Sequence, residues 1–143
     1  MKNHIKIFLY DSIMYPNYHL MTSSSLFILP AIYGIYKGHI ILPFLSFLCT
    51  SRTIDYWTKP DKNPYTILID QTICKTTGSL YLLYGYFTIE TVNKRILFWS
   101  DLFIMLFIYQ ISCNLRNSRY KNLWIPAHML FHYIYTMNQF LVL

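Results

Sequence analysis

Two histidines near the C-terminus, His128 and His132, are the residues best placed for chemistry in this chain. Their four-residue spacing is about one helical turn, so on a helix both imidazoles point to the same side. Two imidazoles placed in this way can bind one transition metal. Met129 stands where zinc proteases of the His-Glu-x-x-His class have glutamate, which excludes that class. The competing interpretation is that both rings form hydrogen bonds with neighbouring helices or lipid headgroups.

Three other polar residues are candidates for the same site. Ser51 and Asp55 are also four residues apart, and Asp70 follows them within the next apolar run. A carboxylate and two imidazoles, with an open position for water, match the ligand set of a catalytic zinc site. The alternative role of Asp70 and Ser51 is interhelical hydrogen bonding or helix capping.

The elements that must position these residues are long apolar runs. A spanning helix needs about 20 mainly apolar residues. We therefore predict an all-α fold, a polytopic transmembrane helix bundle of about five helices, after an interfacial N-terminal segment at 1–18. Four spanning helices remain an alternative if the first two form a re-entrant pair. The helices expected in the 19–143 bundle cover 20–36, 39–57, 64–89, 96–115 and 123–143.

The composition agrees with a membrane protein. Hydrophobic residues make up 55% of the 143 residues and charged residues only 13%, whereas soluble domains carry about 25% charged residues. The net charge of +6 is spread between the apolar runs, which argues against a nucleic-acid interface. Abundant Lys, Asn, Ile, Tyr and Phe are typical of an AT-rich genome and favour a viral or parasite source.

The three cysteines lie in or beside apolar runs. They form no Cys-x-x-Cys motif, so neither a zinc knuckle nor a disulfide framework is indicated. We expect Cys49, Cys74 and Cys113 to be small buried side chains.

The basic residues predict the orientation in the membrane. With the N-terminus in the cytosol, eight Lys and Arg residues fall on the inner side and three on the outer side, which agrees with the positive-inside rule. The inner group is Lys2, Lys6, Arg52, Lys59, Lys62, Arg116, Arg119 and Lys121, and the outer group is Lys37, Lys94 and Arg95. The same topology places Ser51, Asp55, Asp70, His128 and His132 together at the inner face.

This arrangement resembles the seven-helix superfamily of alkaline ceramidases, adiponectin/progestin receptors, Per1-like and myomaker-like proteins. The family has Ser-x-x-x-His at the end of one helix, Asp at the start of the next and His-x-x-x-His on the last. The segments CTSRTIDYW, TILIDQTI and IPAHMLFHYIY are similar to these three motifs and lie within about a third of the chain. The chain departs from this pattern in two ways. Asp55 stands where the family has its first histidine, and only one helix lies between the third helix and the last, where the family has three.

The resemblance implies a zinc-dependent hydrolase that acts on a lipid amide or ester arriving from the bilayer. His128 and His132 would bind the zinc, with Asp55 as the carboxylate in place of the missing ligand. Asp70 would orient or activate the metal-bound water, and Ser51 would help to stabilise an oxyanion. Two other functions remain open: a non-catalytic membrane or envelope protein with a degenerate version of this fold, and a small oligomeric channel.

Overall fold

The computed structural model describes residues 17–58 and 63–143, and these residues are helical without any strand. The all-α prediction is therefore confirmed for the described part of the chain. Most of the interfacial segment expected at 1–18 lies outside the described residues. The elements are α2 (Tyr18–Ser25), α3 (Ile28–Tyr36), α4 (Ile41–Thr58), α5 (Pro64–Thr88), α6 (Val92–Arg116), a 3-10 turn η1 (Lys121–Leu123) and α7 (Trp124–Val142).

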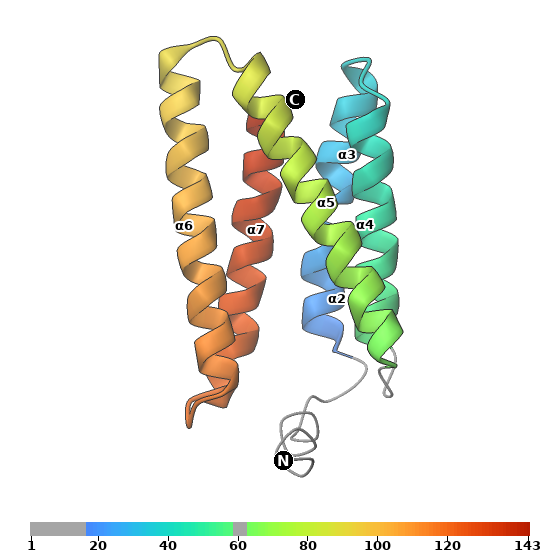
Figure 1. Cartoon of the computed structure of the whole chain (residues 1–143), viewed down its shortest axis with the longest axis vertical. Helices are drawn as coiled ribbons and strands as arrows, with labels where there is room; N and C mark the ends of the chain where they lie inside the picture. The colour runs from blue at the N-terminus through green and yellow to red at the C-terminus, as the bar shows by residue number, and fades with distance from the viewer. Residues whose placement is uncertain (1–16, 59–62) are drawn as a thin grey trace.

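The helices run up and down through one bundle (Figure 1). The helices α2 and α3 follow each other along one path, so the described residues form five helical segments across the bundle, as many as the sequence predicts. Helix α7 packs against α2, α3, α5 and α6, while α4 packs against α2, α3 and α5. The end of α4, the end of α6 and the start of α7 therefore meet at the end of the bundle where α2 begins.

The first predicted helix, 20–36, is broken, which corrects the expectation of one continuous helix. At Leu26 and Phe27 the backbone N–H groups bond to the third preceding carbonyl groups, those of Ser23 and Ser24. Pro30 has no N–H to donate to Leu26, and its ring would clash with that carbonyl in a regular helix. The local hydrogen bonding therefore changes just before the proline, and α3 starts as a new helix at Ile28.

Other boundaries follow from single residues. Asn17 caps α2 by accepting a hydrogen bond from the Leu20 N–H at 3.1 Å. Asn63 caps α5, where Pro64 occupies the first turn and needs no hydrogen-bond partner for its nitrogen. Gly38 has φ +84° in the tight turn between α3 and α4, a conformation that disfavours other residues.

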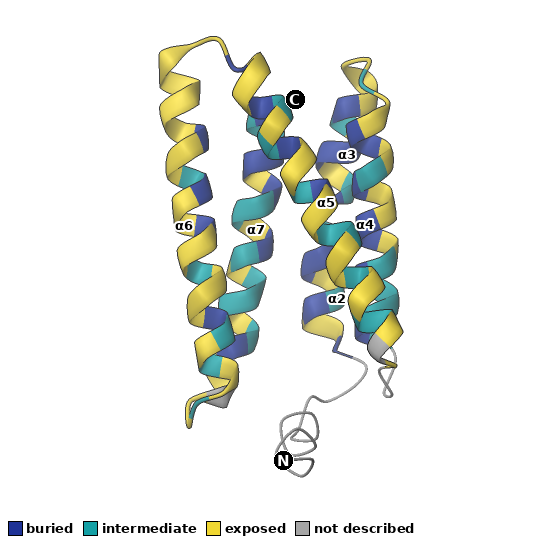
Figure 2. Ribbon diagram, viewed as in Figure 1, coloured by how far each residue is buried: buried dark blue, intermediate teal, exposed yellow. Residues whose placement is uncertain are grey.

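The described interior is about as polar as it is apolar, while large apolar side chains cover the outside. The described interior contains 13 buried apolar residues but also 12 buried polar ones, including Ser46, Thr50 and Gln139. Large apolar side chains cover the outside, for example Phe103 at 69% exposure and Phe107 at 67%. Figure 2 shows the outer side of α6 almost continuously exposed and the buried positions turned towards α7.

One described helix, α6, is long and apolar enough to cross a membrane by length and composition. Its 25 residues begin four residues earlier than expected, at Val92. The described helices α2 and α3 have only 8 and 9 residues, which is too short to cross a membrane. On α4 and α7, many of the polar side chains face the interior.

Candidate functional site

The two histidines of α7 lie next to each other, as their spacing predicts. Their ring centroids are 4.8 Å apart and the rings are inclined at 71°. His132 is buried at 3% exposure, while His128 is half-buried. Aromatic rings surround the pair: Trp124 lies 5.9 Å from His128, and Phe27 lies 5.2 Å from His132, between centroids. The sequence therefore placed the two imidazoles correctly relative to each other.

Serine hydroxyl groups on two other helices contact the Nδ1 atoms of these rings. Ser23 Oγ on α2 lies 2.8 Å from His132 Nδ1, and Ser24 Oγ lies 3.4 Å from the same atom. Ser112 Oγ on α6 lies 3.2 Å from His128 Nδ1. All three serines are buried. The histidine pair thus joins α7 to α2 on one side and to α6 on the other.

The proton of Ser23 has its own acceptor, because Ser23 Oγ lies 3.1 Å from the Leu20 carbonyl oxygen. A hydroxyl group has one proton to donate. When Ser23 donates to that carbonyl, its oxygen accepts from His132 Nδ1–H, which leaves a lone pair on Nε2. Among the described residues, neither histidine makes a hydrogen bond through Nε2. Metal-binding histidines commonly have this arrangement, with one nitrogen on the metal and the other held by a hydrogen bond.

Asp70 on α5 lies in a different group of side chains, between α4 and α5. Its Oδ1 accepts a hydrogen bond from Thr53 Oγ1 at 3.3 Å and lies 3.9 Å from Cys74 Sγ. Cys74 Sγ lies 3.2 Å from Cys49 Sγ and 3.4 Å from Thr53 Oγ1. Asp70 therefore contacts Thr53 and the thiol of Cys74, which in turn lies against Cys49.

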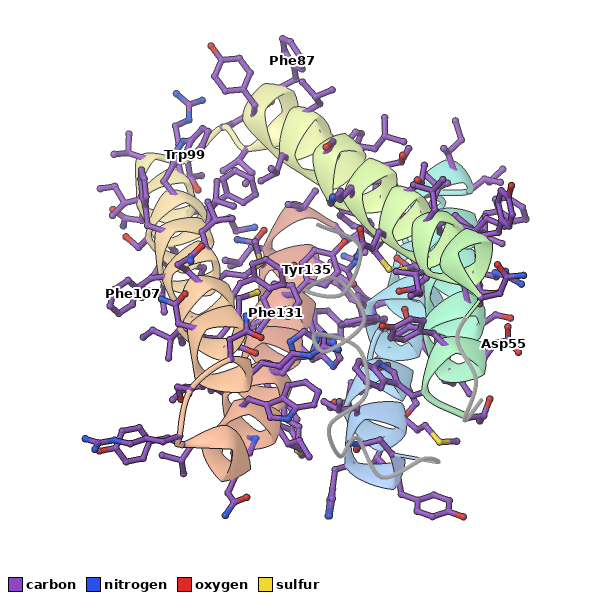
Figure 3. The ribbon with its side chains drawn as sticks, turned by 60° about the horizontal axis from the view of Figure 1, so that its bottom comes forward. Asp55, Phe87, Trp99, Phe107, Phe131 and Tyr135 are labelled. Carbon is purple, nitrogen blue, oxygen red and sulfur yellow. The ribbon has the colours of Figure 1, made fainter. Side chains whose placement is uncertain are left out.

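Asp55 and Ser51, on α4, are placed differently from the expected zinc site. Asp55 forms an ion pair with Arg52, with 3.8 Å between Oδ2 and Nη1, and its side chain is 32% exposed. Figure 3 shows Asp55 on the outer side of α4, away from Phe131 and Tyr135 in the interior. Ser51 is exposed. Within residues 17–58 and 63–143, no three His, Cys, Asp or Glu side chains form a group that could hold a metal.

The sequence interpretation missed the serine partners of the histidines and the contact between two cysteines. The run Ser23-Ser24-Ser25 is a visible signal, since serines within an apolar helix need partners in the interior. Ser112 lies between Gln110 and Asn114 near the end of the long apolar run at 96–115, and it gives a weaker signal of the same kind. The thiol contact had no sequence signal, because Cys49 and Cys74 lie on different helices and their register depends on packing.

Comparisons of the chain with protein-family profiles, with curated protein sequences and with solved structures gave no match. The likeness to the ceramidase superfamily therefore depends on the short motifs alone. What the site can do has to be inferred from the geometry of this chain.

Proposed function

We propose that the chain is a multi-pass integral membrane protein with a transition-metal site at His128 and His132. An apolar exterior around a half-polar interior carries the membrane part of this proposal. Polar groups such as His132 and Gln139 are buried, whereas Phe87 and Ile40 are exposed at 77% and 79%. Water would disfavour this arrangement, but a bilayer favours it because lipid chains are apolar.

The lengths of the helices support the same proposal. Helix α4 has 18 residues and α7 has 19, which at 1.5 Å per residue gives about 27–29 Å. The helices α5 and α6 have 25 residues each, or about 38 Å before any tilt. The hydrocarbon core of a bilayer is about 30 Å thick. One part of the surface is polar and not apolar, because the middle of α5 exposes a stripe of Gln71, Thr72, Lys75, Thr76 and Ser79.

The orientation proposed has the N-terminus in the cytosol. Of the described basic residues, Arg52, Arg116, Arg119 and Lys121 belong to the end of the bundle where α2 begins. Lys37, Lys94 and Arg95 belong to the opposite end. Short cytosolic loops carry an excess of Lys and Arg, so the first end is assigned to the cytosol.

The metal part of the proposal is supported by the histidine geometry. The two rings are adjacent, and hydroxyl groups hold both Nδ1 atoms. Each Nε2 is thus available as a ligand, and imidazole nitrogen suits zinc and copper. Ser23 and Ser112 would fix the ring orientations, which is the usual task of the outer shell around a metal.

A catalytic zinc of the ceramidase kind needs three protein ligands. The described residues fit this requirement only in part, because Asp55 is not grouped with the two imidazoles. If the chain is an enzyme, the reaction proposed for it is hydrolysis of a lipid amide or ester.

A second function, a non-catalytic membrane protein with this metal site, is favoured by a separate observation. A groove with a volume of about 680 Å³ lies at the opposite end of the bundle from His128. Its lining is mainly apolar and comes from the α3–α4 turn, from the start of α4 and from α5, including Ile41, Leu83 and Phe87. A lipid in that groove would lie far from the histidines.

The test measures metal content and lipid turnover on the same protein. Purified full-length chain should contain about one zinc or copper per molecule, and the His128→Ala/His132→Ala variant should contain none. His39→Ala is the matched control, since His39 contacts Tyr84 at the other end of the bundle and should not affect metal content. Metal with hydrolysis of an N-acyl lipid supports the enzyme, and metal without it supports the second function. Metal-free protein after careful preparation would contradict both.

A further inference from the structure

The thiols of Cys49 on α4 and Cys74 on α5 lie close enough to react with each other. Their sulfur atoms are 3.2 Å apart, and both cysteines are free. A disulfide has an S–S length of about 2.05 Å, so bond formation requires the sulfur atoms to approach by roughly 1.2 Å. This movement is small for side chains on two helices that already pack together.

The two cysteines differ in access. Cys49 is buried at 2% exposure, whereas Cys74 is half-buried. A reagent from outside therefore meets Cys74 first, and Cys49 is placed to react with whatever forms on Cys74.

Cys74 also has an acid-base partner. Its sulfur lies 3.9 Å from Asp70 Oδ1 and 3.4 Å from Thr53 Oγ1, and Thr53 donates a hydrogen bond to Asp70. The thiolate is the reactive form of cysteine. A carboxylate in this position can take the thiol proton as the sulfur attacks and return it to the leaving group.

We propose that Cys49 and Cys74 form a redox-active thiol pair that reduces hydroperoxides and becomes a disulfide between α4 and α5. A hydroperoxide fits because it is small and uncharged, so it can reach a half-buried thiol within an apolar bundle. This activity does not depend on the histidine pair, whose side chains lie between α2, α6 and α7.

The reaction has two steps. In the first, the sulfur of Cys74 attacks the terminal hydroperoxide oxygen, an S–O bond forms, the O–O bond breaks, and the proton held by Asp70 goes to the departing alcohol or water. In the second, the sulfur of Cys49 attacks Cys74, the S–S bond forms, the S–O bond breaks, and water leaves with the Cys49 proton. Two thiols lose two electrons and two protons, and the hydroperoxide is reduced to an alcohol (or water) plus water.

The experiment uses the reduced full-length protein in phospholipid vesicles, treated with hydrogen peroxide or with the apolar cumene hydroperoxide. Remaining thiols are alkylated and the peptides are identified by mass spectrometry. We expect a peptide pair joined through Cys49 and Cys74, while Cys113 stays available for alkylation. Whichever hydroperoxide reacts faster indicates whether the natural oxidant comes from water or from lipid.

Variants separate the roles of the residues. Cys49→Ser should leave a sulfenic acid on Cys74 that dimedone traps, and Cys113→Ser should behave like the unmodified chain. Asp70→Asn should slow disulfide formation by at least about tenfold if the carboxylate transfers the proton. The first decisive measurement is made on the unmodified chain. If Cys113 is consumed before Cys49 and Cys74 form a disulfide, the proposal is overturned. Dimedone on Cys49 instead of Cys74 would overturn the order of attack, and an unchanged rate in Asp70→Asn would overturn the role of the carboxylate.

Discussion

A buried hydrogen bond between α4 and α5 gives the sharpest test of the packing. Ser46 Oγ lies 2.8 Å from the Tyr81 hydroxyl oxygen, and Gln139 Nε2 on α7 donates to Ser46 Oγ at 3.4 Å. Ser46 is 0% exposed and Tyr81 is 1% exposed. The serine hydroxyl therefore connects three helices at a position that solvent does not reach.

Ser46→Ala should destabilise the fold by about 1–2 kcal/mol, because it leaves a buried phenol and a buried amide without this partner. Tyr81→Phe should cost less, since Ser46 keeps the contact with Gln139. The two changes remove the same short hydrogen bond, so their effects should not add. Interhelical hydrogen bonds in membranes average about 0.6 kcal/mol and reach about 1.7 kcal/mol, which sets the expected coupling energy.

The free energies of unfolding of the four proteins in this cycle can be compared in mixed micelles by tryptophan fluorescence during a denaturing-detergent titration. Ser79→Ala is the matched control, because Ser79 is an exposed serine on α5 and should change stability by less than about 0.5 kcal/mol. Additive effects within about 0.3 kcal/mol would refute the contact between Ser46 and Tyr81.

Three further predictions concern packing, capping and topology. Gly85→Leu should destabilise the bundle by about 1–3 kcal/mol or more, because even a Cβ atom would lie 2.8 Å from the Phe98 ring, and thermal unfolding measures the loss. Asn17→Ala should cost about 1 kcal/mol in the same assay by removing the cap of α2, and an unchanged midpoint would contradict the cap. In sealed vesicles, an impermeant maleimide should label Glu90→Cys and Tyr120→Cys from opposite sides, and labelling of both from one side would contradict the multi-pass topology.

The helices were predictable because each one leaves a strong local signal. The uncharged run from Leu123 to the C-terminus indicates α7, and Asn63-Pro64 marks the start of α5 through a cap and a first-turn proline. The break between α2 and α3 was harder to expect. Its proline and its serine run are both visible in the sequence, but neither alone decides whether a helix bends, breaks or continues.

The candidate site was predictable only within one helix. His128 and His132 share α7, so their relative position follows from the helical repeat. A contact between Asp55 and these rings could be predicted only if the rotation of α4 about its own axis were known. In the structure, α4 turns Thr53 and Trp57 inward, and Asp55 forms an ion pair with Arg52 instead. Topology was enough to predict that Asp55 and the two histidines lie near the same end of the bundle. It does not determine which face of a helix points inward.

On α7, the polar residues that lower the hydropathy of the helix are also residues that support the membrane proposal. A hydropathy average counts His132, Thr136, Asn138 and Gln139 against α7 as if lipid surrounded every side of the helix. All four are buried, and Asn138 donates to the Phe98 carbonyl oxygen at 3.1 Å. A polar group with a partner inside the bundle costs far less than one facing lipid. Helix α6 has a higher hydropathy because it lies at the edge of the bundle and packs mainly on α7, so most of its surface would face lipid in the proposed membrane.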